Sequence, residues 1–282
     1  MTGNERQTKK TSHPKFPKIV ADGGVDAETD LHTFWSCPAN ACIEDECVTN
    51  TQELITQAES GADIYPCLWL RGILPAFLTY IATEYLPHDE TLITHVEKIV
   101  IPDETKWTSG TYYGDSSGGV HTDHKILRRV GCSVVSCDSS GNLKYGSHFN
   151  LPGIIQTVAR GELFALVQLI RMIEPLSDIE FVTDDLGVNT CFNKGPAHTQ
   201  KSRNVDLFNE LFKLTIDKRI KLNVRWMPSH LKDEDPLPAD VSRLDVLCSR
   251  HADHYAGVAA AEFQLDNSIT APVLKYSLLI SP

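Results

Sequence analysis

The chain has 282 residues, of which 41% are hydrophobic and 22% are charged, the balance of an ordinary globular protein. The apolar runs are far too short to cross a bilayer, so we expect no membrane segment. The net charge of −11 has the wrong sign for binding nucleic acid through overall charge alone.

Residues 1–30 are polar and lack a periodic apolar pattern, which predicts a disordered tail. This segment has no apolar core of the kind found in a secretory signal peptide. Eight cysteines in a chain of this length do not indicate a disulfide scaffold. We therefore expect reduced thiols in an intracellular protein, either cytoplasmic or nuclear.

Residues 31–102 predict a small helical region of unknown role. Asn50–Glu59 predicts a capped helix, and residues 66–85 have a helical rhythm that Gly72 and Pro75 interrupt. Four cysteines in this region leave a zinc site open as an alternative, although their spacing lacks the tight pair of a zinc knuckle. They are Cys37, Cys42, Cys47 and Cys67.

Residues 103–265 predict one domain with three strands, then alternating helices and strands, and a last Ala-rich helix. The expected strands are 111–113, 129–137, 143–149, 179–183 and 221–227, and the expected helices are 158–173, 205–218 and 250–262. This order predicts an α/β fold with a five-stranded mixed sheet, its first three strands antiparallel, flanked by helices. Residues 266–282 are expected to form a C-terminal tail.

Positive charge is concentrated between residues 193 and 232, where nine Lys and Arg stand against three Asp and Glu. A solvated helix face and a surface that binds phosphates both explain such a stretch, and the composition leaves the two open.

Four acidic residues lie where the predicted strands end or within the predicted helices. Asp115 and Asp184 follow strands, and Glu162 and Asp253 belong to helices. Carboxylates gathered at one edge of a sheet repel one another, and hard divalent cations such as Mg²⁺ or Mn²⁺ remove that repulsion. Taken singly, each acid is explained as a turn former, a helix cap or a charge near a helix N-terminus.

Residues 113–261 resemble the ribonuclease H family, in the form carried by reverse-transcribing elements. The matching motifs are GDSSGG around Asp115, QTVARGEL up to Glu162, TDD with Asp184, WMPSH with His230, and ADHYAGVAA with Asp253. The last helix departs from the family, in which it usually begins with Gly-Asn or Asn-x-x-Ala-Asp, whereas this chain has CSRHAD. The second aspartate of TDD, Asp185, adds a charge where Ser or Asn is commoner.

The resemblance implies a ribonuclease H-like fold and a metal-dependent endoribonuclease that hydrolyses the RNA strand of RNA–DNA hybrids with two Mg²⁺ ions, with Mn²⁺ as an alternative. The implied metal ligands are Asp115, Glu162, Asp184 and Asp253, and His230 is the implied mobile helper. Residues expected to contact the hybrid are Gly119, Gln156 and Arg160, and those expected to hold phosphates of the DNA strand are Lys194, Lys201 and Arg203.

Two further points stay open. Asp240 competes with Asp253 as the fourth ligand, and we prefer Asp253 because an Ala-rich helix follows it, whereas Pro236 and Pro238 crowd Asp240. The acidic net charge and the unusual entry to the last helix also fit a catalytically inactive relic that binds nucleic acid or protein. A transposase-like nuclease of the same fold is a third reading, against which the missing DNA-binding domain counts.

Overall fold

The computed structural model describes residues 29–84, 86, 94–95, 107–232 and 234–280. The predicted tail at residues 1–30 lies outside this part of the chain except for Thr29 and Asp30. The chain divides into two compact units, the first ending at Ile73 and the second beginning at Leu74. In the described residues, no helix has the length and apolar character needed to traverse a bilayer.

The first unit consists of short helical segments. In chain order they are η1 (His32–Ser36), η2 (Pro38–Cys42), α1 (Glu46–Thr51), η3 (Gln52–Leu54), α2 (Ile55–Gly61) and α3 (Pro66–Arg71). The helix predicted to begin at Asn50 begins at Glu46 instead, because the Asp45 carboxylate caps it by accepting a hydrogen bond from the Cys47 amide. The predicted break at Gly72 is confirmed, since this glycine ends α3 with a φ of +61°.

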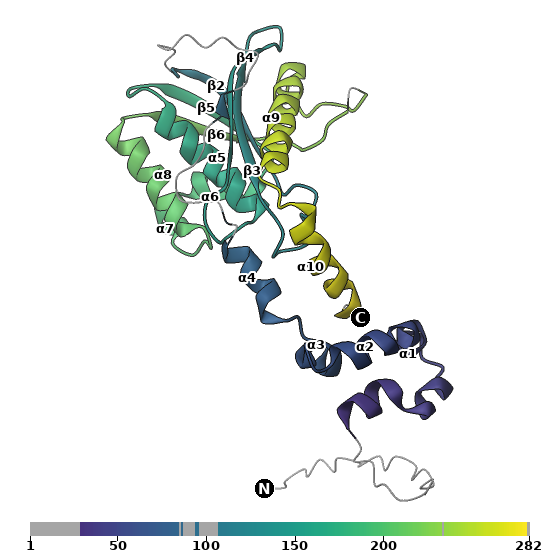
Figure 1. The fold of residues 1–282 in the computed structure, drawn as a ribbon. Coiled ribbons are helices and arrows are strands. Elements are labelled where there is room, and N and C mark those ends of the chain that lie inside the picture. Colours follow the sequence, from purple (N-terminus) through teal and green to yellow (C-terminus); the bar gives the residue numbers. More distant parts are fainter. Residues whose placement is uncertain (1–28, 85, 87–93, 96–106, 233, 281–282) are drawn as a thin grey trace, which may run out of the picture. The chain divides into compact units, whose positions relative to one another are not determined.

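The second unit is built on one mixed sheet with the strand order β1-β4-β3-β2-β5-β6 (Figure 1). The strands are β1 (Thr94–His95), β2 (Gly110–Ser117), β3 (Gly131–Cys137), β4 (Leu143–Asn150), β5 (Asp178–Thr183) and β6 (Lys221–Trp226). β2, β3 and β4 pair antiparallel, whereas β5 is parallel to β2 and β6 is parallel to β5. The predicted mixed sheet is confirmed, and the two-residue β1, which no sequence pattern indicated, extends it at the β4 edge.

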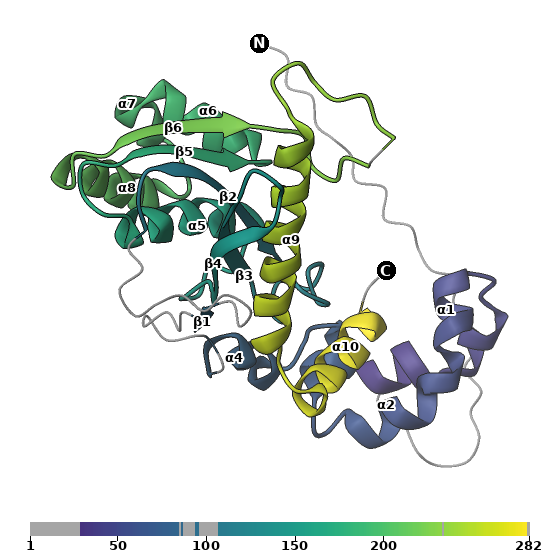
Figure 2. The same ribbon diagram turned by 90° about the horizontal axis from the view of Figure 1, so that it is seen from above.

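Helices cover both faces of the sheet (Figures 1 and 2). α5 (Val158–Met172) packs on β2 and β3 from one side and contacts α8 (Val205–Asp217), and α9 (Arg243–Glu262) packs on β2, β3 and β4 from the other. The neighbouring residues Tyr112 and Tyr113 of β2 belong to apolar cores on opposite faces. Burial on both faces explains why the strands are rich in apolar residues.

Four elements differ from the sequence-based expectation near the site. β2 continues through Ser117 instead of ending at residue 113, because its ladder with β3 runs to Ser117 and Gly131. α9 begins at Arg243 and not at residue 250, because Ser242 and Asp245 form a capping box. The short helices α6 (Leu186–Lys194) and α7 (Pro196–Thr199) were not predicted.

The predicted C-terminal tail forms helix α10 (Asn267–Ile280). The Asp266 carboxylate accepts a hydrogen bond from the Ser268 amide at its start. Val273 is buried against Leu127 and against Leu78 of α4 (Ala76–Glu84). α4 and α10 thus belong to the sheet-bearing unit, which begins at Leu74 and not near the predicted boundary at residue 103.

Candidate metal centre and active-site pocket

Asp115 lies on the central strand β2, where it pairs with Ser133 of β3. Its neighbour Gly114 faces the opposite side of the sheet, where an added Cβ would come within 2.3 Å of the Phe181 ring. The glycine therefore allows a buried phenylalanine to pack beneath the strand. The sequence had suggested that Asp115 lies at the end of its strand, but it lies within β2. The pairing of β2 with β3 and with β5 fixes the position of this strand.

Glu162 comes from α5 and is only 2% exposed. The Ser116 amide donates to one of its carboxylate oxygens at 2.7 Å, and the Thr183 hydroxyl donates to the other at 3.3 Å. The preceding Gly161 permits this approach, because a Cβ there would lie 2.7 Å from side-chain carbons of Ser116 and Val130. The glycine that separates Arg160 from Glu162 is thus required by the packing of α5 against the sheet.

Asp184 follows β5, and its carbonyl oxygen accepts a hydrogen bond from the Trp226 indole at 2.9 Å. The next residue, Asp185, is the N-cap of α6, since its carboxylate accepts from the Val188 amide at 2.8 Å. The second aspartate of the TDD motif therefore starts a helix, and only the first reaches the carboxylate cluster.

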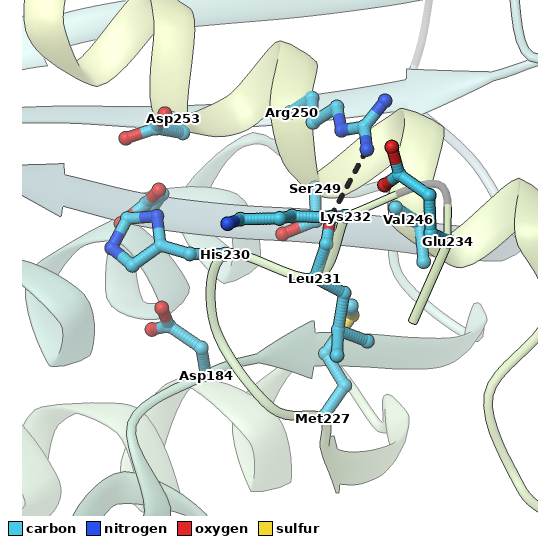
Figure 3. A pocket seen from close by; sticks show the side chains of 11 residues that line it. Asp184, Met227, His230, Leu231, Lys232, Glu234, Val246, Ser249, Arg250 and Asp253 are labelled. Carbon is cyan, nitrogen blue, oxygen red and sulfur yellow. Dashed lines mark hydrogen bonds between the residues drawn. The ribbon is translucent and has the colours of Figure 1, made fainter. Parts of the chain in front are cut away.

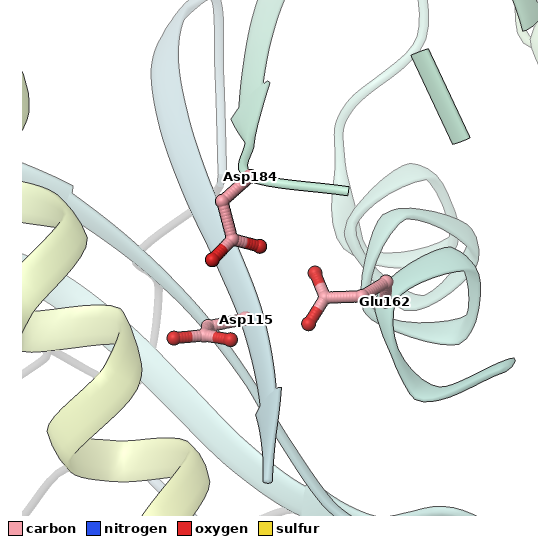
Figure 4. A group of neighbouring side chains, drawn as sticks. All are labelled: Asp115, Glu162 and Asp184. Carbon is pink, nitrogen blue, oxygen red and sulfur yellow. The ribbon is translucent and has the colours of Figure 1, made fainter. Parts of the chain in front are cut away.

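One carboxylate oxygen from each of Asp115, Glu162 and Asp184 lies within 4.8 Å of those of the other two (Figure 4). Burial and the charge of Asp184 raise the pKa of Asp115 to about 7, and burial and the charge of Asp115 raise the pKa of Glu162 well above its usual value. Burial also raises the pKa of Asp184. In the part of the chain that the structure describes, no Lys or Arg forms an ion pair with these groups.

An open pocket of about 490 Å³ lies beside this cluster and contains Asp115, Asp184, His230 and Asp253 in its lining (Figure 3). One stripe of α9 faces the pocket at helical spacing, through Val246, Ser249, Arg250 and Asp253. The charge of Asp253 contributes to the raised pKa of both Asp115 and Asp184. Asp240 is not part of this lining; it precedes α9, and its carbonyl oxygen accepts from Arg225.

His230 lies exposed at the pocket and has a φ of +52°, the left-handed region that residues other than glycine seldom adopt. Lys232 and Glu234 follow it in the same lining. A sequence motif indicated His230, whereas no motif indicated Lys232, Arg250 or Glu234 as pocket residues. The only signal for Lys232 and Glu234 was the charge of the segment after WMPSH, which is equally typical of a solvated loop, and Arg250 stands in CSRHAD without a role of its own.

The residues expected to contact a hybrid fall into two groups. Gln156 is buried, with its carbonyl oxygen accepting from the Val130 amide and its two N–H groups donating to Leu151 and Gly153 carbonyls. Arg160 pairs with Asp206 of α8. These two side chains therefore bind other parts of the protein, whereas the other three long side chains are exposed cations. They are Lys194, Lys201 and Arg203.

Gly119, the remaining residue of that set, is half-buried and has a φ of +66°, and a Cβ there would collide with the Gln264 amide. The structure thus explains the glycine by a tight turn after β2. The four cysteines of the first unit are free thiols. Among the described residues, the carboxylates of Asp115, Glu162 and Asp184 are the only group with the spacing of a metal site, so the zinc alternative receives no support.

No family model matches the chain, and no curated protein matches it. Solved structures do match, among them LC11-RNase H1 in complex with an RNA/DNA hybrid, at 13% identity and a TM-score of 0.38, over 54% of this chain and 96% of that one. RNase H1 from the halophilic archaeon Halobacterium salinarum matches at 13% identity and a TM-score of 0.38, over 54% of this chain and 97% of that one. The N-terminal RNase H domain of rv2228c from Mycobacterium tuberculosis matches at 15% identity and a TM-score of 0.35, over 55% of this chain and 98% of that one.

The described strands have the mixed arrangement, with helices on both faces, that the sequence analysis expected. Three antiparallel strands, β4, β3 and β2, are followed across the sheet by the parallel strands β5 and β6. The helix α5 lies on one face and α9 on the other.

Proposed function

We propose that this chain is a metal-dependent endonuclease of the ribonuclease H type, which hydrolyses the RNA strand of RNA–DNA hybrids. The observation that carries the proposal is the meeting of Asp115, Glu162 and Asp184 within 4.8 Å, beside a pocket that also contains Asp253 and His230. The sequence motifs around these residues support the choice of substrate. On the same motifs we propose an origin in a retroelement polyprotein.

The donor set fits hard divalent cations, because it consists of carboxylate oxygens that repel one another and that form no ion pair with a Lys or Arg among the described residues. Asp115, Glu162, Asp184 and Asp253 would hold two Mg²⁺ ions, with Mn²⁺ as the alternative. When bound, such ions lower the pKa of a coordinated water and stabilise a departing oxygen.

The side chains of the protein hold the metal ligands in place and transfer protons. Ser116 and Thr183 fix the carboxylate of Glu162, so this ligand needs little rearrangement when a cation arrives. Asp115 is held by a strand that is paired on both sides. His230, exposed at the pocket, can take up or release a proton as the product leaves.

The partner we propose is the hybrid duplex, held by its phosphates at the exposed cations of the last residue of α6 and the segment that follows it. Lys194, Lys201 and Arg203 have no ion-pair partner among the described residues. Replacing all three by alanine should weaken hybrid binding and reduce its salt dependence by about 0.7 to 0.9 log unit for each phosphate that is no longer bound. An unchanged salt slope in a binding titration would assign them to a solvated surface.

The decisive experiment incubates the full chain with a labelled RNA–DNA hybrid, with Mg²⁺ and with EDTA, beside duplex DNA and duplex RNA. Cleavage of only the RNA strand of the hybrid, dependent on the metal and absent in Asp115→Asn, is expected. A folded chain that binds the hybrid and leaves it intact would favour the inactive relic, and cleavage of duplex DNA would favour a nuclease of another specificity.

The same protein can be tested without activity, by thermal melting. Mg²⁺ binds the assembled carboxylates and not the unfolded chain, so at tenfold excess over its Kd it should add about 1.4 kcal/mol to the free energy of unfolding. A melting temperature indifferent to Mg²⁺ and Mn²⁺, with and without hybrid, would count against the metal site.

A further inference from the structure

We infer that Lys232 forms a subsite for a second phosphate of the bound strand, beside the phosphate that the carboxylates would act on. The inference rests on the proposed function and deepens it. Lys232 belongs to the lining of the same pocket as Asp115, Asp184 and Asp253. It has the opposite charge, and no sequence motif singled it out.

The side chain of Lys232 is directed into the pocket. In Figure 3 its ammonium group extends across the cavity toward His230, with Asp184 and Asp253 on the same side. The residue is exposed, and within the described residues its ammonium makes no ion pair with a carboxylate. A cation therefore stands near the acidic cluster without being neutralised by it.

The backbone around Lys232 is held in place from three sides. His230 turns the chain with its left-handed φ of +52°. The Lys232 amide donates to the Asp235 carboxylate at 2.8 Å. The Leu231 carbonyl oxygen accepts from the Arg250 guanidinium at 3.0 Å (Figure 3). These contacts thus set the backbone position from which the lysine side chain extends.

Arg250 links this loop to the metal ligands. It lies one helical turn before Asp253 on the same face of α9, so the helix that presents a carboxylate also holds the loop that presents the lysine. We assign Arg250 as a positioning residue that acts through Leu231, and Lys232 as the residue that touches substrate.

The chemistry selects a phosphodiester as the ligand. The carboxylates in the pocket lining repel a polyanion, and cations bound there would offset their charge only locally. The next phosphate along a nucleic-acid strand needs its own counter-charge, and a lysine supplies a compact one that reaches a single phosphate oxygen. An acidic peptide would meet the same repulsion without the regular spacing of charges that a strand provides.

The test measures binding of the full chain to hybrids in EDTA, each hybrid carrying one uncharged methylphosphonate linkage at a different position. The wild type should lose affinity several-fold when one particular linkage is neutral. Lys232→Ala should bind the fully charged hybrid with an affinity lower than that of the wild type by about the same factor. Its affinity should not fall further when that linkage is neutral, and the slope of log affinity against log salt should be smaller by about 0.7 to 0.9. Lys144→Ala, an exposed lysine at the start of β4, is the matched control and should behave as wild type.

Arg250→Ala should lose the same linkage-specific part of the affinity, and the double variant Lys232→Ala/Arg250→Ala should be no weaker there than Lys232→Ala alone. With Mg²⁺, Lys232→Ala should raise KM more than it lowers kcat. Wild-type affinity and slope in Lys232→Ala, or an equal loss at every linkage, would overturn the subsite. A wild type that binds hybrid without cleaving it overturns only the proposed function, and one that binds no hybrid overturns both.

Discussion

At the scale of single residues, the carboxylate cluster is costly to the metal-free protein. Burial raises the pKa of both Asp115 and Glu162, and the charge of a neighbouring aspartate raises each further, that of Asp184 for Asp115 and that of Asp115 for Glu162. A carboxyl group with a higher pKa in the folded chain than in the unfolded chain binds protons more tightly when folded. Its contribution to stability is complete below the unfolded pKa and is lost as the pH rises through the folded pKa.

For Asp115 this window runs from its ordinary pKa of 3.8 to about 7. In EDTA, the melting temperature of wild type should therefore fall relative to Asp115→Asn as the pH rises through that window. Calorimetric scans of both proteins across the range measure the difference. Parallel curves for the two proteins would show that Asp115 titrates normally.

The fourth carboxylate can be identified by a matched pair of variants. Asp253 lines the pocket, whereas Asp240 precedes α9 outside it. Asp253→Asn should lower the cleavage rate by about two orders of magnitude or more, the scale on which removing one group that stabilises a transition state acts, and Asp240→Asn should leave it nearly unchanged. Single-turnover rates on a labelled hybrid distinguish them, and the reverse ranking would mean that the fourth ligand comes from the loop.

The role of a site residue could be predicted from the sequence where its neighbours in the chain also form its surroundings in the fold. Glu162 and Asp184 stand in short motifs that carry their own context, and the structure brings both together with Asp115. Gln156 also stands in a motif, but its burial depends on hydrogen bonds with Val130 and Leu151, which no local pattern contains. Lys232 lines the pocket in a loop whose Leu231 carbonyl oxygen accepts from Arg250 of α9, a contact between elements that no local pattern contains.

At the scale of elements, glycines decide how closely helices approach the sheet. Gly161 lies where α5 meets β2, whereas Gly257 lies in α9 with open space at its Cβ position. Gly161→Ala should destabilise the fold by about 1 to 3 kcal/mol, because neither Ser116 nor Val130 can move away easily. Gly257→Ala should stabilise it by about 0.4 to 1 kcal/mol. Urea titrations test the pair, and equal effects would show that α5 tolerates a shift.

The helix ends were harder to predict than the strands. Strands β3 and β4 are joined by a turn and reveal themselves through alternation and turn residues. The start of α9 has a capping box at Ser242 and Asp245, but two nearby prolines favoured a loop in that region. α10 contains Pro272 in its interior, and a proline there ordinarily argues against a helix. The packing of α10 on α4 and Leu127 explains why the helix nevertheless forms.

At the scale of the whole molecule, the sheet-bearing unit is larger than its sequence motifs suggest. α4 and α10 lie outside the stretch that resembles ribonuclease H, yet Leu78, Leu127 and Val273 form a buried cluster that joins them to the rest. The predicted boundary near residue 103 was placed by the sequence motifs. Such motifs indicate which residues belong to the site, but they do not indicate which other segments pack on the domain. Asp115, Glu162 and Asp184 all belong to the second unit.

Truncation tests this division. A fragment of residues 74–282 should unfold in one transition and keep the cleavage rate of the full chain. A fragment of residues 103–282 should be less stable by about 2 to 5 kcal/mol or more, because it lacks the buried Leu78 and the removal of one buried leucine side chain has a cost on that scale. Urea unfolding of both fragments measures this, and equal midpoints would place α4 outside the folding unit.

The position of α9 in the chain has a consequence for synthesis. β2 to β6 are complete before α9 emerges, and until then the sheet face bearing Tyr113, Val135 and Val182 has no cover. A partly made chain thus exposes apolar surface and lacks Asp253 at the same moment. The interval between synthesis of β6 and of α9 is therefore the stage at which we expect a nascent chain to be most prone to aggregate, and catalysis of the proposed kind would begin only once that helix has docked.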